Sequence, residues 1–219
     1  MKRSLTITED GSHTMFAEGL NERYHSMHGA LRESMHVFIK QGLLTLNVPS
    51  VRILEIGFGT GLNALLSFSE AYRQKLNIYY HAVEKYPLKE PEYSLLNYEK
   101  MIKDLQKGIL QRMHSCPWEQ AVQISDRFTL YKEQADFRSM KPHSPVHLVY
   151  FDAFSPDKQP ELWSSEVMGI IAEAAVPGTV MVTYSAKGVV RRTLGSCGFE
   201  VFKVEGPPGK REMTRAVKR

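Results

Sequence analysis

The sequence contains little cysteine and no long apolar run. Cys116 and Cys197 are the two cysteines among 219 residues, and no Cys/His cluster has the spacing of a zinc site. We therefore expect reduced thiols and no bound metal. No apolar run approaches the roughly 20 residues that a transmembrane helix needs, and the basic N-terminus lacks the apolar core of a signal peptide. These absences favour a cytoplasmic protein without membrane contact.

Length and charge narrow the class further. With 219 residues, 42% of them hydrophobic and 24% charged, the chain is long enough for one well-buried domain and short for two. The last ten residues contain five basic residues and one acid, a surplus of four that equals the net charge of +4. A basic end suits a polyanion such as RNA, although a solvated terminal segment explains the charge equally well.

A glycine turn follows the first strongly apolar segment of the chain. Val51–Ile56 is predicted to be a buried strand, and Leu62–Tyr72 an amphipathic helix. Between them Gly57, Gly59 and Gly61 stand at alternate positions. A strand, a glycine turn and a helix bring backbone N–H groups against a nucleotide-like ligand. The spacing G-x-G-x-G differs from the dinucleotide fingerprint G-x-G-x-x-G, and a tight structural turn is the alternative.

The acid before the glycines indicates which ligand the turn holds. Glu55 lies two residues before Gly57, where it is badly placed for a pyrophosphate and well placed for the amino group of a methionine moiety. The segment from Glu55 to Asn63 resembles motif I, E-x-G-x-G-x-G, of the class I S-adenosylmethionine-dependent methyltransferases. That resemblance implies that Glu55, the three glycines and Asn63 bind S-adenosylmethionine.

Two further acids follow predicted strands. Asn77–Glu84 reads as a strand that ends in Glu84, 23 residues after Gly61, where an acid can accept both hydroxyls of a ribose; an ordinary surface acid is the alternative. Asp136 follows the predicted strand Arg127–Tyr131. In methyltransferases of this class an acid there often binds the adenine amino group, and a helix N-cap is the alternative.

Two stretches flank this cofactor fold. Residues 1–50 are predicted to form a lead-in that caps the mouth of the site, with a hairpin over Ser4–Phe16 and an amphipathic helix over Gly29–Leu44. Residues 51–219 would then form the methyltransferase domain. Residues 86–125 are predicted to be helical and polar, with one helical pattern from Tyr93 to Met113. Their length is consistent with a substrate-side insertion, which the sequence does not decide.

The second strongly apolar strand, Val146–Phe151, ends in Asp152. Open α/β sheets bind ligands at the carboxyl ends of their strands, so Asp152 is a candidate catalytic residue. In the loop that follows, Phe154 is predicted to stack on a base in a flat substrate pocket, whereas Trp163 is predicted to pack in the core. The loop leads to a predicted helix over Ser164–Ala175.

The C-terminal part predicts the sheet topology. Pro177 and Gly178 are expected to end that helix, and strands are predicted over Thr179–Tyr184, Phe199–Val204 and Glu212–Val217. The last connection is so short that its two strands must be antiparallel. We therefore predict an α/β, Rossmann-like class I methyltransferase fold, with a mostly parallel seven-stranded sheet, an antiparallel C-terminal hairpin and helices on both faces.

Four ordered blocks resemble one particular methyltransferase family. Residues 152–163, DAFSPDKQPELW, resemble D-(A/G)-F-(A/S)-P-x-K-N-P-(E/D)-M-W of the MnmC-type tRNA-modifying enzymes, with Gln159 and Leu162 as mild departures. Residues 209–213 resemble P-K-R-E-M, and residues 24–38 resemble Y-F-S…G…E-(S/T)-x-x-V-F with one extra residue. The glycine turn is the fourth block. Bifunctional members continue into a flavin-dependent oxidase, so for this chain, which stops at Arg219, the resemblance implies no flavin.

The resemblance implies a methyl transfer to tRNA. The methyl of S-adenosylmethionine would pass to the amine of 5-aminomethyl-(2-thio)uridine at the wobble position, within the anticodon stem-loop. Asp152 would hold the amine, either as a base or by orienting it. The other implied contacts are of two kinds: cofactor contacts from Tyr24, Ser26 and Glu33, and candidate phosphate contacts from Lys187, Arg191, Lys210 and Arg211.

Three other functions remain open from the sequence. An aminopropyltransferase of the spermidine synthase type shares the fold, a strand-end acid and an amine nucleophile, but its polycationic substrate fits poorly with a basic C-terminus. A small-molecule amine N-methyltransferase fits if the basic end only aids solubility. A non-catalytic RNA-binding module would not need Glu55, Glu84 and Asp152. The sequence leaves the oligomeric state open.

Overall fold

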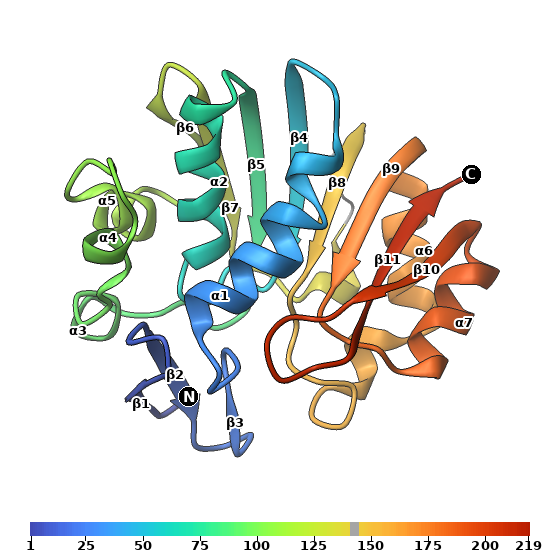
Figure 1. Ribbon diagram of the computed structural model, residues 1–219, viewed down its shortest axis with the longest axis horizontal. Coiled ribbons are helices and arrows are strands. Elements are labelled where there is room, and N and C mark those ends of the chain that lie inside the picture. Colours follow the sequence, from blue (N-terminus) through green and yellow to red (C-terminus); the bar gives the residue numbers. More distant parts are fainter. Residues whose placement is uncertain (141–144) are drawn as a thin grey trace.

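The computed structural model describes residues 1–140 and 145–219, and its main feature is a twisted mixed sheet (Figure 1). Within these residues the sheet has eight strands in the order β10-β11-β9-β8-β4-β5-β7-β6. The strands are β4 (Ser50–Ile56), β5 (Asn77–Val83), β6 (Ala121–Ser125), β7 (Phe128–Glu133), β8 (Val146–Phe151), β9 (Ala175–Thr183), β10 (Phe199–Glu205) and β11 (Glu212–Lys218).

The five central strands, β9-β8-β4-β5-β7, pair in parallel. At one edge β6 is antiparallel to β7, and at the other β11 pairs antiparallel with both β9 and β10. The predicted fold class and the antiparallel C-terminal hairpin are confirmed. The predicted number of seven strands was one too low, because β6 lies in a segment that we expected to be helical.

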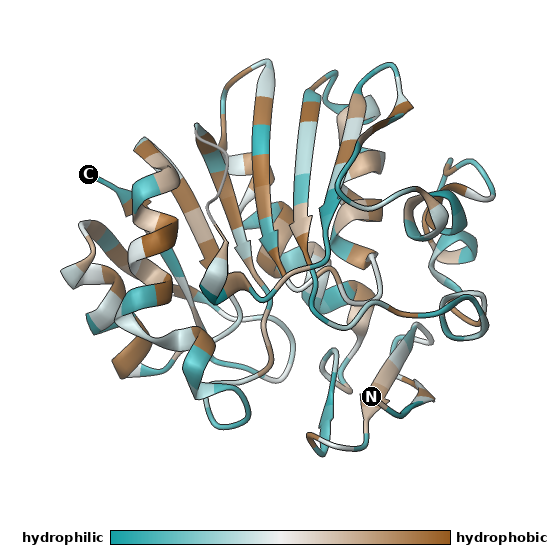
Figure 2. Ribbon diagram, turned by 180° about the vertical axis from the view of Figure 1, so that it is seen from behind, coloured by the Kyte–Doolittle hydropathy of each residue, from teal (hydrophilic) through white to brown (hydrophobic). Residues whose placement is uncertain are grey.

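Helices cover both faces of the sheet, and each face has its own apolar cluster. Neighbouring residues of a strand point to opposite faces. Ile53 of β4 therefore belongs to one cluster with Leu65 of α2 (Leu62–Arg73), and Leu54 belongs to the other with Val167 of α6 (Ser165–Ala174) and Leu194 of α7 (Gly188–Ser196). Apolar colour is frequent on the central strands, and the loops at the rim are largely hydrophilic (Figure 2). Strands buried on both faces explain the continuous apolar runs of the sequence.

The N-terminal segment forms a small three-stranded sheet from β1 (Arg3–Ile7), β2 (His13–Ala17) and β3 (Glu22–Arg23). The predicted hairpin is confirmed. The helix predicted over 29–44 begins as α1 (Ala30–Ser34), widens into a π-helix (η1, Met35–Lys40), and is followed by a 3-10 turn (η2, Leu43–Thr45). Its Phe38 belongs to the same core cluster as α2. In Figure 1 the helix that begins with α1 crosses in front of the sheet beside α2, and the small sheet lies below it, on the side of the carboxyl ends of the parallel strands.

Two expectations for local structure were wrong. The helical pattern from Tyr93 to Met113 is divided into α3 (Glu90–Tyr93), α4 (Tyr98–Met101) and α5 (Ile109–Ser115). Asp104 (φ 62°) and Gly108 (φ 83°) take the left-handed conformation between α4 and α5, which a continuous helix excludes. Likewise α6 ends at Ala174, before the proline and glycine, and β9 runs through both. None of the described helices is long and apolar enough to cross a bilayer.

Candidate active site

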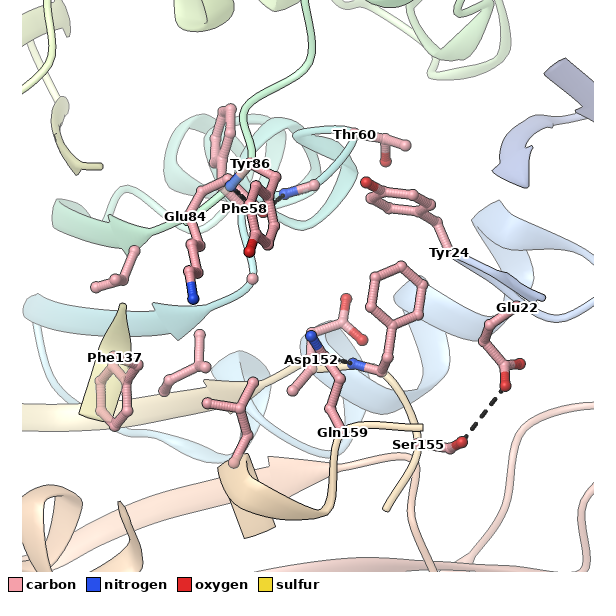
Figure 3. Close-up of a pocket in the computed structure, with 18 of the residues that line it drawn as sticks. Glu22, Tyr24, Phe58, Thr60, Glu84, Tyr86, Phe137, Asp152, Ser155 and Gln159 are labelled. Carbon is pink, nitrogen blue, oxygen red and sulfur yellow. Dashed lines mark hydrogen bonds between the residues drawn. The ribbon is translucent and has the colours of Figure 1, made fainter. Parts of the chain in front are cut away.

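A cavity of about 460 Å³ opens at the carboxyl ends of the parallel strands (Figure 3). Four of the five central strands bring the residue that follows them to this edge: Gly57 follows β4, Glu84 follows β5, Asp152 follows β8 and Tyr184 follows β9. Parallel strands of an open sheet place such residues side by side. The volume lies within the range of small-molecule sites, roughly 300–1,000 Å³.

The glycine turn forms one wall of this cavity. Gly57 has a φ of 93°, and a Cβ there would lie 2.8 Å from the Asp152 carbonyl oxygen. At Gly59 (φ 49°) a Cβ would lie 3.0 Å from the Tyr24 ring. Gly61 begins α2 and lies behind the wall, against His114. The backbone of 57 and 59 therefore lines the cavity directly because these residues carry no side chain.

Glu84 links the glycine turn to the end of β5. One carboxylate oxygen accepts a hydrogen bond from the Gly59 N–H at 3.0 Å, and the other accepts from the Tyr86 N–H at 2.7 Å. The side chain is half-buried and lines the cavity. Its carboxylate is thus held at the turn, in the position where we predicted a ribose contact.

Asp136 lines the cavity and forms the helix N-cap that the sequence offered as the alternative to an adenine contact. It caps the short 3-10 helix η3 (Phe137–Ser139), accepting from the Arg138 N–H at 3.1 Å. Ion pairs with Arg138 (2.6 Å) and Lys85 (3.0 Å) surround the same carboxylate. Hydrogen bonds from Arg138 hold the pKa of Asp136 well below its usual range. The residue also lines the cavity, so the adenine contact stays a prediction.

Asn63 connects two acids at the centre of the site. Its Nδ2 donates to Glu55 Oε1 at 2.9 Å and to Asp152 Oδ2 at 2.8 Å. Asn63 and Asp152 line the cavity, whereas Glu55 is fully buried and does not. Glu55 reaches the cavity wall through Asn63, and its predicted contact with a methionine amino group stays a prediction.

Burial sets the protonation of these acids. It raises the pKa of Glu55 well above its usual range, and the neighbouring charge of Asp152 raises it further. Burial and the charge of Glu33 likewise raise the pKa of Asp152 well above its usual range, although the Asn63 hydrogen bond and the charge of Lys210 oppose the rise. Burial favours the neutral form of both carboxyls. Of the two, Asp152 is the acid that faces the cavity.

The loop after Asp152 is pinned to the core. Phe154 donates its N–H to the Gln159 side chain at 3.3 Å, and its carbonyl accepts from the Trp163 indole N–H at 2.9 Å. Trp163 is 5% exposed and belongs to the core cluster beside α6. Phe154 lines the cavity, and its ring forms a T-shaped contact with the Tyr24 ring, with 5.0 Å between the ring centroids. Trp163 thus packs in the core as predicted, and it fixes the backbone of the aromatic residue at the pocket.

The N-terminal candidates reach the cavity from the small sheet and α1. The Tyr24 hydroxyl accepts from Arg3 Nε at 2.7 Å, and Tyr24 covers the glycine turn. Ser26 donates its N–H to Glu33 at 2.7 Å. All three predicted residues, Tyr24, Ser26 and Glu33, line the cavity. In Figure 3, Tyr24, Glu84 and Asp152 lie around the same space.

The four candidate phosphate contacts do not form one group. Lys210 lines the cavity and pairs with Glu33 at 3.0 Å. The other three lie outside it: Lys187 pairs with Asp157, Arg191 pairs with Glu212, and Arg211 is exposed in a shallow hollow next to the cavity. The basic end is also not a free tail, because residues 212–218 form β11.

Sequence reasoning missed Tyr184. Its hydroxyl donates to the Ala153 carbonyl at 2.9 Å, and its ring faces the Lys210 ammonium at 4.2 Å. Tyr184 directly follows β9, so the rule that selected Glu84 and Asp152 would have found it. The described residues contain no group of three or more His, Cys, Asp or Glu that could hold a metal ion.

Comparisons with known proteins agree with this geometry. A family model described as S-adenosyl-L-methionine-dependent methyltransferase matches residues 97–219. A bifunctional protein MnmC for tRNA 5-methylaminomethyl-2-thiouridine biosynthesis, from Marinomonas sp., is 31% identical over 96% of this chain and 33% of its own length. Its counterpart from Delftia acidovorans is 31% identical over 93% of this chain and 33% of its own length. The chain thus spans about a third of these curated relatives.

A solved structure supports the same relationship over the full chain. The crystal structure of MNMC2 from Aquifex aeolicus is 28% identical, with a TM-score of 0.83, and covers 100% of this chain and 70% of that one. The resemblance to MnmC-type proteins is confirmed. Because the family model matches more than half of the sequence and the glycine wall and strand-end acids fit its cofactor, the chain belongs to the S-adenosyl-L-methionine-dependent methyltransferase family.

Proposed function

We propose that this chain methylates the amine of 5-aminomethyl-(2-thio)uridine at the wobble position of tRNA, giving the 5-methylaminomethyl form. The observation that carries the proposal is Asp152 at the cavity, followed by the pinned aromatic Phe154. The MnmC relatives are named for the biosynthesis of 5-methylaminomethyl-2-thiouridine in tRNA, which supports the same substrate. The proposal includes the anticodon stem-loop as the binding partner, a cytoplasmic location, and residues 1–50 as a cap over a methyltransferase domain of residues 51–219.

The cofactor fits the wall formed by the glycine turn. The backbone at Gly57 and Gly59 would approach it closely, and Glu84 would hold its ribose from the end of β5. Asp136 and Tyr24, which also line the cavity, would border the same molecule. When bound, S-adenosylmethionine supplies an electrophilic methyl group on its sulfonium.

Asp152 prepares the acceptor. A primary alkyl amine has a pKa near that of lysine, about 10, and is mostly protonated at neutral pH. The Asp152 carboxylate, fixed on one side by Asn63, can accept a hydrogen bond from the ammonium, receive its proton and aim the lone pair. Phe154 and Tyr24 offer the aromatic surfaces on which an unstacked uracil can lie.

Nucleoside mass spectrometry tests the proposal. Purified protein is incubated with S-adenosylmethionine and tRNA carrying 5-aminomethyl-2-thiouridine, and the nucleosides are then analysed. We expect the mass of that nucleoside to increase by one methyl group, and Asp152→Ala to bind the cofactor yet lose most turnover. No mass increase on that nucleoside would refute the assignment.

A control distinguishes the small-molecule alternative. The free nucleoside and simple primary amines are offered in parallel with the modified tRNA. Turnover of free amines at the rate of the tRNA would favour a small-molecule N-methyltransferase. Transfer of an aminopropyl group from decarboxylated S-adenosylmethionine would identify the protein as an aminopropyltransferase.

A further inference from the structure

An ion pair closes one corner of the cavity. Lys210 lies in the connection between β10 and β11, and Glu33 lies on α1, 177 positions earlier. Lys210 Nζ is 3.0 Å from Glu33 Oε1 and 4.2 Å from the centroid of the Tyr184 ring. The Glu33 side chain is 9% exposed. A carboxylate as buried as this requires a partner for its charge.

Glu33 is held from two sides. While one oxygen receives the Lys210 ammonium, the other accepts the Ser26 N–H at 2.7 Å. The Lys210 ammonium is correspondingly engaged by a carboxylate and an aromatic face. A cation held in this way inside the cavity is not free to meet a phosphate, the role that the sequence first indicated for Lys210.

This corner adjoins Asp152. Burial is the largest cause that raises the pKa of Asp152; the charge of Glu33 adds to the rise and the charge of Lys210 opposes it. Burial and the charges of Asp152, Glu33 and Glu22 raise the pKa of Tyr184, which favours its neutral form. The titratable groups that interact with Asp152 are Glu33 of α1, Glu55 of β4, Tyr80 of β5, Tyr184 after β9 and Lys210 of the β10–β11 connection.

We propose that Lys210 is a positioning residue for methyl transfer: its ammonium compensates the charge of Glu33 and thereby favours the ionised form of Asp152, which receives the proton of the substrate amine. The proposal rests on the proposed function. In the step concerned, a proton passes from the substrate ammonium to the Asp152 carboxylate. The freed lone pair then forms the N–C bond as the C–S bond of the sulfonium breaks, which leaves a thioether and a methylated ammonium.

The arrangement also gives the corner a balanced charge when substrate is present. Glu33 and Lys210 cancel each other, and Asp152 and the incoming ammonium form the second pair. Without Lys210, one ammonium would face two carboxylates. Asp152 would then keep its proton up to a higher pH than in the wild-type protein.

The experiment compares Lys210→Met, Lys210→Arg, Glu33→Gln and the double variant Glu33→Gln/Lys210→Met. Lys203→Met is the matched control, because Lys203 lies on β10 of the same hairpin and its side chain is 59% exposed. Folding is checked by circular dichroism. The titration of Asp152 is followed by 13C NMR of labelled aspartate carboxyls, with Asp152→Asn for assignment, and kcat for modified tRNA is measured against pH.

We expect Lys210→Met to raise the pKa of Asp152 by about one unit, the effect of a nearby uncompensated charge. Activity that needs ionised Asp152 is lost as pH falls through this pKa, so the acidic limb of kcat should move to higher pH by the same amount. Lys210→Arg should restore the limb, and the double variant should return it close to wild type because both charges are gone. Lys203→Met should leave it unchanged.

A different pattern would overturn the proposal. If Lys210 only contacts phosphate, Lys210→Met raises KM for tRNA, leaves the acidic limb in place and is not rescued by Glu33→Gln. The proposal is also wrong if Asp152 has the same pKa in the wild-type protein and in Lys210→Met. The NMR titration needs no substrate, so it decides the role of Lys210 even if the wild-type protein fails to methylate tRNA.

Discussion

Replacement of Asn63 is the sharpest test of how the site is arranged. One nitrogen, Nδ2, lies 2.8 Å from Asp152 Oδ2 and 2.9 Å from Glu55 Oε1. A hydrogen bond to a charged group contributes about 1.5–3 kcal/mol, and about 1.4 kcal/mol corresponds to a tenfold change in rate. Because Asp152 loses the donor that orients it, we expect Asn63→Ala to lower kcat by about 10- to 100-fold.

The same substitution also acts on stability. Without the amide, two buried carboxyls lose their common donor, and we expect the free energy of unfolding to fall by about 2 kcal/mol. Asn63→Asp has nearly the same shape but replaces the donor with a third acid, so it should cost more in both measurements. Urea unfolding gives the stability, and steady-state methyl transfer gives kcat.

Ser67 provides the matched control. It lies one turn further along α2, is fully buried and forms a hydrogen bond of 3.2 Å with Tyr150. Ser67→Ala should cost about 1 kcal/mol of stability and leave kcat unchanged, since it touches neither acid. A folded Asn63→Ala protein with kcat within about twofold of wild type would refute the view that this amide orients Asp152.

Three further predictions concern the cofactor, the loop and the RNA. Glu84→Gln keeps one acceptor for the two N–H groups of Gly59 and Tyr86, so the Kd for S-adenosylmethionine, measured by calorimetry, should rise about tenfold; an unchanged Kd would exclude this role. Trp163→Phe loses the hydrogen bond to Phe154 and should raise KM for tRNA severalfold without changing cofactor affinity, whereas a change in cofactor affinity alone would contradict it. Raising the salt concentration should weaken tRNA binding steeply, because phosphate contacts release counterions. Filter binding at several salt concentrations measures this, and an affinity that does not change with salt would contradict the prediction.

The fold was predictable where short-range patterns decide the structure. The glycine turn, the apolar strands and the short final connection each specify their neighbours within a few residues, and these elements formed as expected. The 93–113 segment was harder. Its apolar spacing fits one helix, but Asp104 and Gly108 adopt left-handed backbone conformations that periodicity does not register. Antiparallel pairing with β7 then fixes β6, a partner that the local sequence does not reveal.

The candidate site was predictable where topology decides it. Strand-end acids such as Asp152 come together because parallel strands end at one edge. Two features depend on tertiary contacts instead. Glu55 does not line the cavity itself, because Asn63 lies between its carboxyl group and the cavity. The pairing of Lys210 with Glu33 joins positions that are 177 residues apart, and no local pattern records such a contact.

The position of β11 between β9 and β10 has a consequence for quality control of the protein. Thr214 pairs with Thr183 on one side and Lys203 on the other. During synthesis, β9 and β10 therefore expose open edges that favour aggregation until β11 inserts. Lys210 stands just before β11 and reaches its carboxylate partner as that strand docks. A chain that has assembled this corner of the cavity has thus also covered the strand edges of β9 and β10 that face each other across β11.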